Sequence, residues 1–136
     1  MRTWFALPAA LAVALLTAAP ASAHGTHTRP AITRLEWLTG PVAVGEEEFL
    51  VVEAHDPDSS ISEVDVVWGD EGISFAHTYC VQGTEIGKPA RLVLSWKFPH
   101  PGLEDVRVVA LSQDHCKPNR SIQRSPTKHL PTPVRP

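Results

Sequence analysis

The sequence predicts an all-β fold, an antiparallel β-sandwich of about seven strands. Three observations support this prediction. Short segments alternate apolar and polar residues, which is the pattern of a strand with one buried face. Turns rich in proline, glycine and aspartate separate these segments at a spacing of roughly ten residues. No window of the sequence carries an apolar stripe with the period of an α-helix.

The first half of the expected sandwich is the less regular half. Ala31–Leu38 alternates with one break, and the Gly-Pro turn that follows leads into a short edge-like piece, Val42–Val44. Glu48–Asp56 carries apolar residues on both of its faces, which is typical of a strand that is covered on both sides near its start.

The second half alternates more cleanly. In Ile61–Gly69, the apolar residues Val64, Val66 and Trp68 share one face, and Asp65 points to the other. We therefore expect these three side chains to face the core. Further strands of the same kind are expected at Ile73–Val81, Ala90–Phe98 and Glu104–Gln113.

The first residues have the composition of an export signal. An apolar run extends from Trp4 to Ala19, and Ala21-Ser22-Ala23 fits the small-x-small rule for cleavage. The sequence thus predicts a signal peptide at residues 1–23 and a secreted, extracellular protein; a retained membrane anchor is the alternative. Later segments are too short or too polar to cross a bilayer, so we expect no membrane span in the mature chain.

Composition divides the remaining chain into three parts. Residues 24–30 are polar and aperiodic and are expected to form a flexible leader, and residues 31–116 form the predicted sandwich. Residues 24–116 carry six basic and fifteen acidic side chains, a balance that argues against a nucleic-acid partner. Residues 117–136 carry five basic side chains, no acidic ones and many prolines, so we expect a disordered tail there, although an irregular edge strand is the alternative.

Cys80 and Cys116 are the two cysteines of the chain. In an exported protein an isolated pair usually forms a disulfide. Paired zinc thiolates are the alternative, but they need further ligands at zinc spacing, and the sequence has no CxxC motif. We therefore predict a Cys80–Cys116 bond.

Four short stretches give the sandwich a family resemblance. The stretches "VGE" at Val44–Glu46, "DPDSS" at Asp56–Ser60 and "WGDEG" at Trp68–Gly72, with the later "PHPGLEDVRVVALS" at Pro99–Ser112, resemble the PKD (polycystic kidney disease) domain. The resemblance covers about residues 32–114. It implies an immunoglobulin-like β-sandwich of the kind common in secreted bacterial proteins, acting as a non-catalytic binding module. Ser59 stands where the family usually has glycine, and Glu104 where it usually has tyrosine.

The acidic turns and the histidines are candidate metal ligands. Asp56, Asp58 and Asp70 offer carboxylates for calcium, and some PKD-like modules bind calcium. The alternative is ordinary turn chemistry, in which Asp side chains bond nearby backbone N–H groups. His24 would be the first residue after cleavage and His27 lies close to it, which suggests a copper site. No cofactor is otherwise expected.

The remaining residues point to binding. The sequence lacks Gly-x-Ser-x-Gly, His-Glu-x-x-His and phosphate-loop motifs, so we expect no catalytic residues and no enzyme activity. Trp37, Trp68, Trp96 and Tyr79 could form a sugar platform, but apolar neighbours place Trp68 and Trp96 in the core. We expect an extracellular protein or a cell-wall polymer as the partner.

Overall fold

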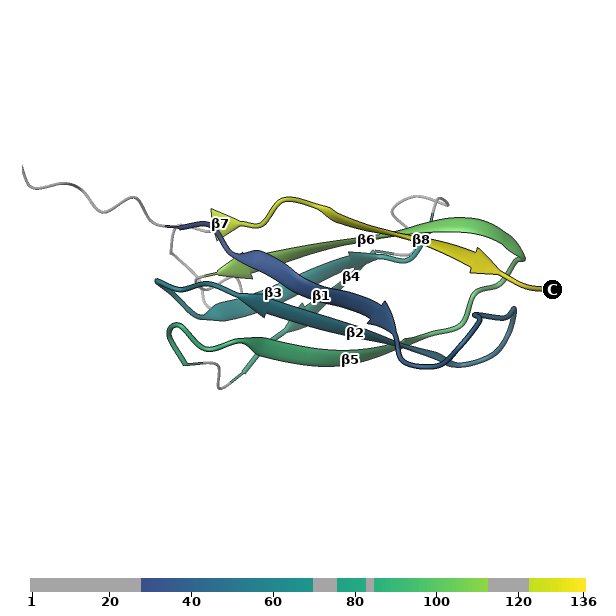
Figure 1. The fold of residues 1–136 in the computed structure, drawn as a ribbon, viewed down its shortest axis with the longest axis horizontal. Helices are drawn as coiled ribbons and strands as arrows, with labels where there is room; N and C mark the ends of the chain where they lie inside the picture. The colour runs from purple at the N-terminus through teal and green to yellow at the C-terminus, as the bar shows by residue number, and fades with distance from the viewer. Residues whose placement is uncertain (1–27, 70–75, 83–84, 113–122) are drawn as a thin grey trace, which may run out of the picture.

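The computed structural model describes residues 28–69, 76–82, 85–112 and 123–136, and these residues form β-strands and no helix (Figure 1). Every strand expected from the alternating segments is present, with the described ends shifted by a few residues; residues 73–75 and 113 of the expected strands lie outside the described part of the chain. The strands are β1 (Ala31–Trp37), β2 (Glu48–His55), β3 (Ile61–Val67), β4 (Ala76–Cys80), β5 (Ala90–Trp96), β6 (Gly102–Ser112), β7 (Gln123–Arg124) and β8 (Lys128–Val134).

The strands form two antiparallel sheets that lie face to face. One sheet has the order β1-β2-β5. The other has the order β4-β3-β6-β7, and β8 pairs with β6 farther along the same edge. β1 pairs with β2, β3 with β4, and β6 with β7, whereas the chain crosses to the other sheet after β2, β4 and β5 (Figure 1). This is the arrangement of an immunoglobulin-like sandwich. The predicted fold class is confirmed.

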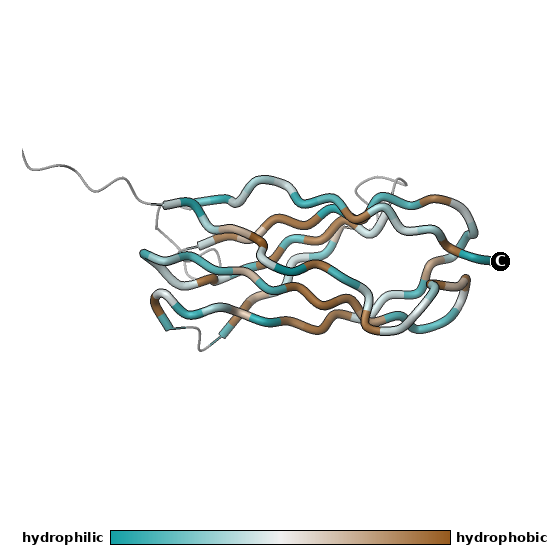
Figure 2. The backbone as a smooth tube through the Cα atoms, viewed as in Figure 1, coloured by the Kyte–Doolittle hydropathy of each residue, from teal (hydrophilic) through white to brown (hydrophobic). Residues whose placement is uncertain are grey.

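The inward faces of both sheets form the core. Hydrophobic residues alternate with hydrophilic ones along the strands in Figure 2, and Val64, Val66 and Trp68 are buried as expected. Opposite them, Leu50 and Val52 of β2 are fully buried. Each of these side chains contributes about 1.5–3 kcal/mol by leaving water, so the sandwich is held together chiefly by apolar burial between the sheets.

Aromatic side chains link the two sheets inside this core. The indole rings of Trp68 and Trp96 stack with centroids 5.3 Å apart and planes inclined by 2°. Trp37 contacts Trp68 at 6.3 Å on one side, and Phe98 packs edge-on against Trp37 at 5.7 Å. The core position expected for Trp68 and Trp96 is confirmed, since Trp68 is buried and Trp96 packs against the core cluster. Trp37 packs there as well.

The end of the chain is the main correction to the sequence prediction. Residues 117–136 were expected to be a disordered tail, but β7 pairs with the end of β6 and β8 pairs with β6 over seven residues, from Val108 opposite Lys128 to Gly102 opposite Val134. Val134 is buried and Leu130 packs against the core. The tail expectation is therefore wrong for residues 123–136, which supply the last strands of the sandwich.

Proline explains this difference, because proline-rich segments are usually disordered, yet proline is also compatible with an edge strand. Pro131 and Pro133 alternate along β8. A proline has no N–H group, so it fits an edge strand at positions whose N–H would point away from the neighbouring strand. Arg135, two residues farther on, donates its N–H to Val42 O at 2.9 Å, on the side away from β6. The prolines of β8 therefore occupy positions where no N–H is needed.

The end of β8 also ties the two sheets together. Ala43 and Arg135 form a parallel bridge, and the N–H of Val44 donates to Arg135 O at 2.9 Å. This bridge takes the place of the expected edge-like piece, Val42–Val44. Buried Glu48 steadies the same loop, because one carboxylate oxygen accepts the N–H of Ala43 at 3.2 Å.

Removal of β8 should destabilise the protein strongly. A chain ending at Ser125 loses the seven-residue pairing with β6 and uncovers part of the core. We expect a loss of more than about 3 kcal/mol in the free energy of unfolding, and hence a fall in Tm of more than about 10 °C. Thermal unfolding followed by circular dichroism measures this; a chain lacking Pro136 alone is the control. An unchanged Tm after the longer truncation would show that β8 adds nothing to the fold.

Candidate binding surface

The outer face of the sheet β1-β2-β5 brings together charged and apolar side chains. Alternation turns Leu50 and Val52 of β2 into the core, so Phe49, Val51 and Glu53 face outward. The register places Glu53 opposite both a residue of β1 and a residue of β5. We define the outer face by its residues, which are Arg34, Glu36, Phe49, Val51, Glu53, Arg91, Val93 and Ser95.

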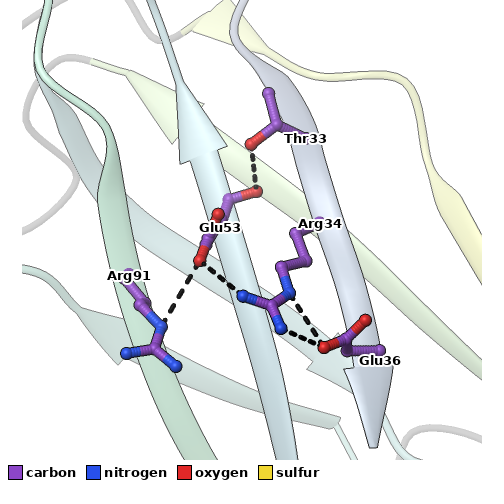
Figure 3. Close-up of polar contacts among 5 residues, drawn as sticks. All are labelled: Thr33, Arg34, Glu36, Glu53 and Arg91. Carbon is purple, nitrogen blue, oxygen red and sulfur yellow. Dashed lines mark hydrogen bonds and ion pairs between the residues drawn. The ribbon is translucent and has the colours of Figure 1, made fainter.

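The charged part of the outer face is a cross-strand network centred on Glu53 (Figure 3). One Glu53 oxygen lies 3.3 Å from Arg34 Nη1 and 3.3 Å from Arg91 Nε. Arg34 also donates from Nε to Glu36 at 2.9 Å. Thr33 Oγ1 donates to the backbone oxygen of Glu53 at 3.3 Å. The network therefore spans all three strands of the sheet.

These ion pairs hold the arginine side chains in fixed positions and contribute little to the stability of the fold. Hydrogen bonding to Glu36 raises the pKa of Arg34, and the same contact lowers the pKa of Glu36. Both groups are exposed to solvent, where ion pairs add little to the free energy of unfolding. They fix the positions of the guanidinium groups, and fixed arginines beside apolar side chains are typical of protein interfaces.

An apolar area lies beside this network. Phe49 is 37% exposed and Val93 is 49% exposed. Val93 stands opposite Val51 and Phe49 stands opposite Ser95 in the register of β2 and β5, so the two exposed side chains lie diagonally across the strand pair. Val51 faces outward yet is fully buried, so it forms the floor of this area.

The acidic turn after β2 is explained largely by turn chemistry. Asp56 is buried, and its Oδ1 accepts the N–H of Asp58 at 3.0 Å, as in an Asx turn. Asp58 Oδ2 accepts the backbone N–H of Thr28 at 2.9 Å, which anchors the end of the expected leader. Asp56 Oδ2 is buried and has no hydrogen-bond partner among the residues that the structure describes. Asp70 lies outside the described residues.

The other predicted site residues fall mostly outside the described part of the chain. His24 and His27, the expected copper ligands, and Cys116 all lie there. Among residues 28–69, 76–82, 85–112 and 123–136, no group of three or more His, Cys, Asp or Glu side chains is placed to hold a metal ion. The copper site stays a prediction.

Cys80 ends β4 at a place that suits the predicted disulfide. Cys80 and Leu111 stand opposite Glu63 on its two sides, so the ends of β4 and β6 lie at the same end of the sheet. The segment that carries Cys116 begins one residue after β6 ends at Ser112. The bond itself stays a prediction.

Sequence reasoning missed one concave feature. A groove of about 250 Å³ lies where β8 passes the end of β1. The residues that line it are Trp37, Gly40, Pro41, Val42, Pro131, Thr132, Pro133 and Arg135. Trp37 Nε1 donates to Thr132 Oγ1 at 3.0 Å across it. The sequence does not indicate this groove, because the composition of residues 131–135 predicts a disordered tail and not a strand that passes the end of β1. It is smaller than most ligand sites.

Comparison with known proteins supports the fold and assigns no ligand or activity to the chain. No family model matches the chain, and no curated protein matches it. The fold is similar to that of a solved PKD domain of an M14-like peptidase from a Thermoplasmatales archaeon, with a TM-score of 0.58 and 18% sequence identity over 81% of this chain and 99% of that chain. The protein thus has a PKD-like, immunoglobulin-like fold. The described residues include no helix that could span a membrane.

Tyr79 gives a direct test of the packing at the inner side of β4. Burial raises the pKa of Tyr79, and contact with Trp68 opposes part of this shift. Tyr79 is the single tyrosine of the chain, so its ionisation can be followed by ultraviolet absorbance. We expect a midpoint above the value of about 10 found for free tyrosine.

The sign of the accompanying stability change follows from linkage. The folded state holds the phenol proton more tightly than the unfolded state, so this contribution is complete below pH about 10 and is lost as pH rises through the folded pKa. Tyr79→Phe should remove the absorbance change and this part of the alkaline loss of stability. A midpoint at or below 10 would contradict the packing described for Tyr79.

Proposed function

We propose that the protein is a secreted, non-catalytic binding module of the PKD-like, immunoglobulin-like type, and that its ligand is an extracellular protein or a cell-surface polymer. The PKD-like fold usually serves as an accessory domain that carries no catalytic site. The apolar run at Trp4–Ala19 and the cleavage motif at Ala21–Ala23 support export.

The outer face of β1-β2-β5 supports the binding role. Phe49 and Val93 are exposed apolar residues, and Arg34 and Arg91 are held beside them by Glu53. Exposed apolar side chains beside ordered arginines are typical of surfaces that bind a macromolecule. The exposed pair Phe49 and Val93 on the same face as the ordered arginines is the observation that carries the proposal.

A matched pair of variants tests which face binds. Phe49→Ala removes one of the two exposed apolar side chains of the outer face, whereas Leu103→Ala removes a side chain that is 69% exposed on the other sheet. The immobilised protein is incubated separately with the secreted proteins and with the purified cell-wall polymer of its source. We expect binding to one of these to fall about tenfold or more with Phe49→Ala, because burial of a phenylalanine contributes about 1.5–3 kcal/mol.

Leu103→Ala should bind as the unmodified protein does. Equal loss with both variants would point to a general change in stability, which the Tm of each variant reports. Equal and full binding by both variants would exclude the outer face as the binding surface.

The buried carboxylate of Asp56 favours a second proposal, calcium binding at Asp56, Asp58 and Asp70. Within the described part of the chain, Asp56 Oδ2 is buried without a hydrogen-bond partner, and a buried charge in this state is costly unless a cation or a donor reaches it. Asp58 is two residues away on the same turn, so both carboxylates can approach one ion.

Calcium should then stabilise the fold through this turn. We expect Ca²⁺ at about 1 mM, the range of extracellular calcium modules, to raise Tm by several degrees, and Mg²⁺ to raise it less. Asp58→Asn should remove most of the rise in Tm that calcium causes. Asp65 lies on the outer side of β3, and Asp65→Asn should leave that rise unchanged. Identical Tm values with and without calcium would rule this site out.

A further inference from the structure

Among the described residues, the two sheets have four edges, and three of these edges carry features that block pairing with another strand. β8 has Pro131 and Pro133 at its outer edge, and β4 is five residues long. In β1 the register shifts between Ile32 and Arg34, so Thr33 forms a bulge. Prolines, short strands and bulges are the usual means by which proteins protect sheet edges.

β5 carries none of these features. Its seven residues pair with β2 in an unbroken register, from Ala90 opposite Ala54 to Trp96 opposite Glu48. It contains no proline and no bulge, and its central residues Leu92–Trp96 are uncharged. In Figure 1, β5 runs along the lower margin of the sandwich. A regular apolar edge of this kind is a template for an added strand.

One hydrogen bond between β2 and the end of β1 fixes the direction of the backbone groups of β5. Leu38 N–H donates to Phe49 O at 2.8 Å, so the backbone groups of Phe49 point toward β1. In a strand, successive residues point these groups to opposite sides. Those of Leu50 therefore point toward β5 and meet Leu94, its partner in the register.

The same alternation along β5 identifies the groups at the open edge. Since the N–H and C=O of Leu94 point toward β2, those of its neighbours point the other way. The residues with backbone groups at the open edge are Arg91, Val93 and Ser95. In the part of the chain that the structure describes, no strand pairs with them.

We propose that this edge pairs with the β5 edge of a second copy of the chain, antiparallel and centred on Val93. Val93 then stands opposite Val93 of the second copy, and Arg91 stands opposite Ser95. On the inner face, Ala90 stands opposite Trp96, so a small side chain meets a large one. No like charges face each other, and the side of Val93 that faces the open edge is covered. All three outward-pointing residues gain backbone hydrogen bonds.

Charge disfavours one neighbouring register and an acidic peptide as the occupant. Centring the pair on Leu94 would place Arg91 opposite Lys97 of the second copy, and like charges directly opposite each other are unfavourable. An acidic peptide from another protein gains little here, because Arg91 already pairs with Glu53 at 3.3 Å. The complementary sizes and charges of the residues that flank Val93 on its two sides favour a second β5 as the partner.

The dimer joins two outer faces into one surface. Two three-stranded sheets become one continuous sheet, and two copies of the Phe49 area lie on its outer side. The inference does not rest on the identity of any ligand. A dimer of this kind presents two equal binding surfaces, so it engages a repetitive polymer more tightly than one copy does.

Sedimentation and light scattering of the purified protein test the proposal. We expect a monomer–dimer equilibrium between roughly 1 µM and 1 mM, since edge pairing buries little surface. Val93→Pro places a proline in β5 as Pro131 and Pro133 are placed in β8. It removes an N–H group that points to the open edge and leaves the backbone hydrogen bonds between β5 and β2 in place. It should weaken dimerisation about tenfold or more, whereas Val93→Thr keeps the N–H and should leave it within about twofold. Circular dichroism confirms that both variants are folded.

Ser95 provides a second test that leaves the backbone unchanged. Ser95→Lys places a cation opposite Arg91 of the second copy and should weaken the dimer at low ionic strength, whereas Ser95→Glu should strengthen it. A protein that stays monomeric throughout this range, including one that takes up an extended peptide instead, would overturn the proposal. So would a dimer that a reductant dissociates, or one that neither Ser95 variant changes.

Discussion

The contact between Trp68 and Trp96 is the interaction on which the rest of the structure depends. Trp68 follows β3 in one sheet and Trp96 ends β5 in the other, and their rings stack at 5.3 Å. Because these large side chains must face inward, the alternation of each strand is fixed. The outward position of Val93 and Ser95, and therefore the character of the outer face and of the β5 edge, follows from that choice.

The sandwich could be predicted because its signal is local. Each core strand alternates within a few residues, so Val64, Val66 and Trp68 could be assigned to the core from their own spacing. The candidate surface could not be predicted in the same way. Glu53 meets Arg34 and Arg91 only because three strands from distant parts of the chain pair in one register, and register depends on turns and packing that the sequence does not display directly.

The end of the chain shows how composition can mislead. Proline and basic residues together indicate disorder in an average sequence, yet β8 places Pro131 and Pro133 where an edge strand needs no donor. Leu130 and Val134 supply its apolar contacts, and they too alternate. The alternation was present in the sequence, but with intervening prolines it looked like isolated apolar residues. The Asx turn between Asp56 and Asp58 could be anticipated from the spacing of the two aspartates, whereas the burial of Asp56 Oδ2 depends on the three-dimensional packing around it.

The bulge at Thr33 has a consequence for how large an assembly can become. A sheet that adds strands at both of its edges grows without limit into a fibre, whereas a self-complementary edge paired with its own copy closes at two. After β5 is used, the strands left at the ends of the joined sheet are the two copies of β1, and each carries an extra residue that interrupts its regular edge. One irregular residue thus sets the difference between a finite pair and an open-ended polymer, far from the side chains that form the pair.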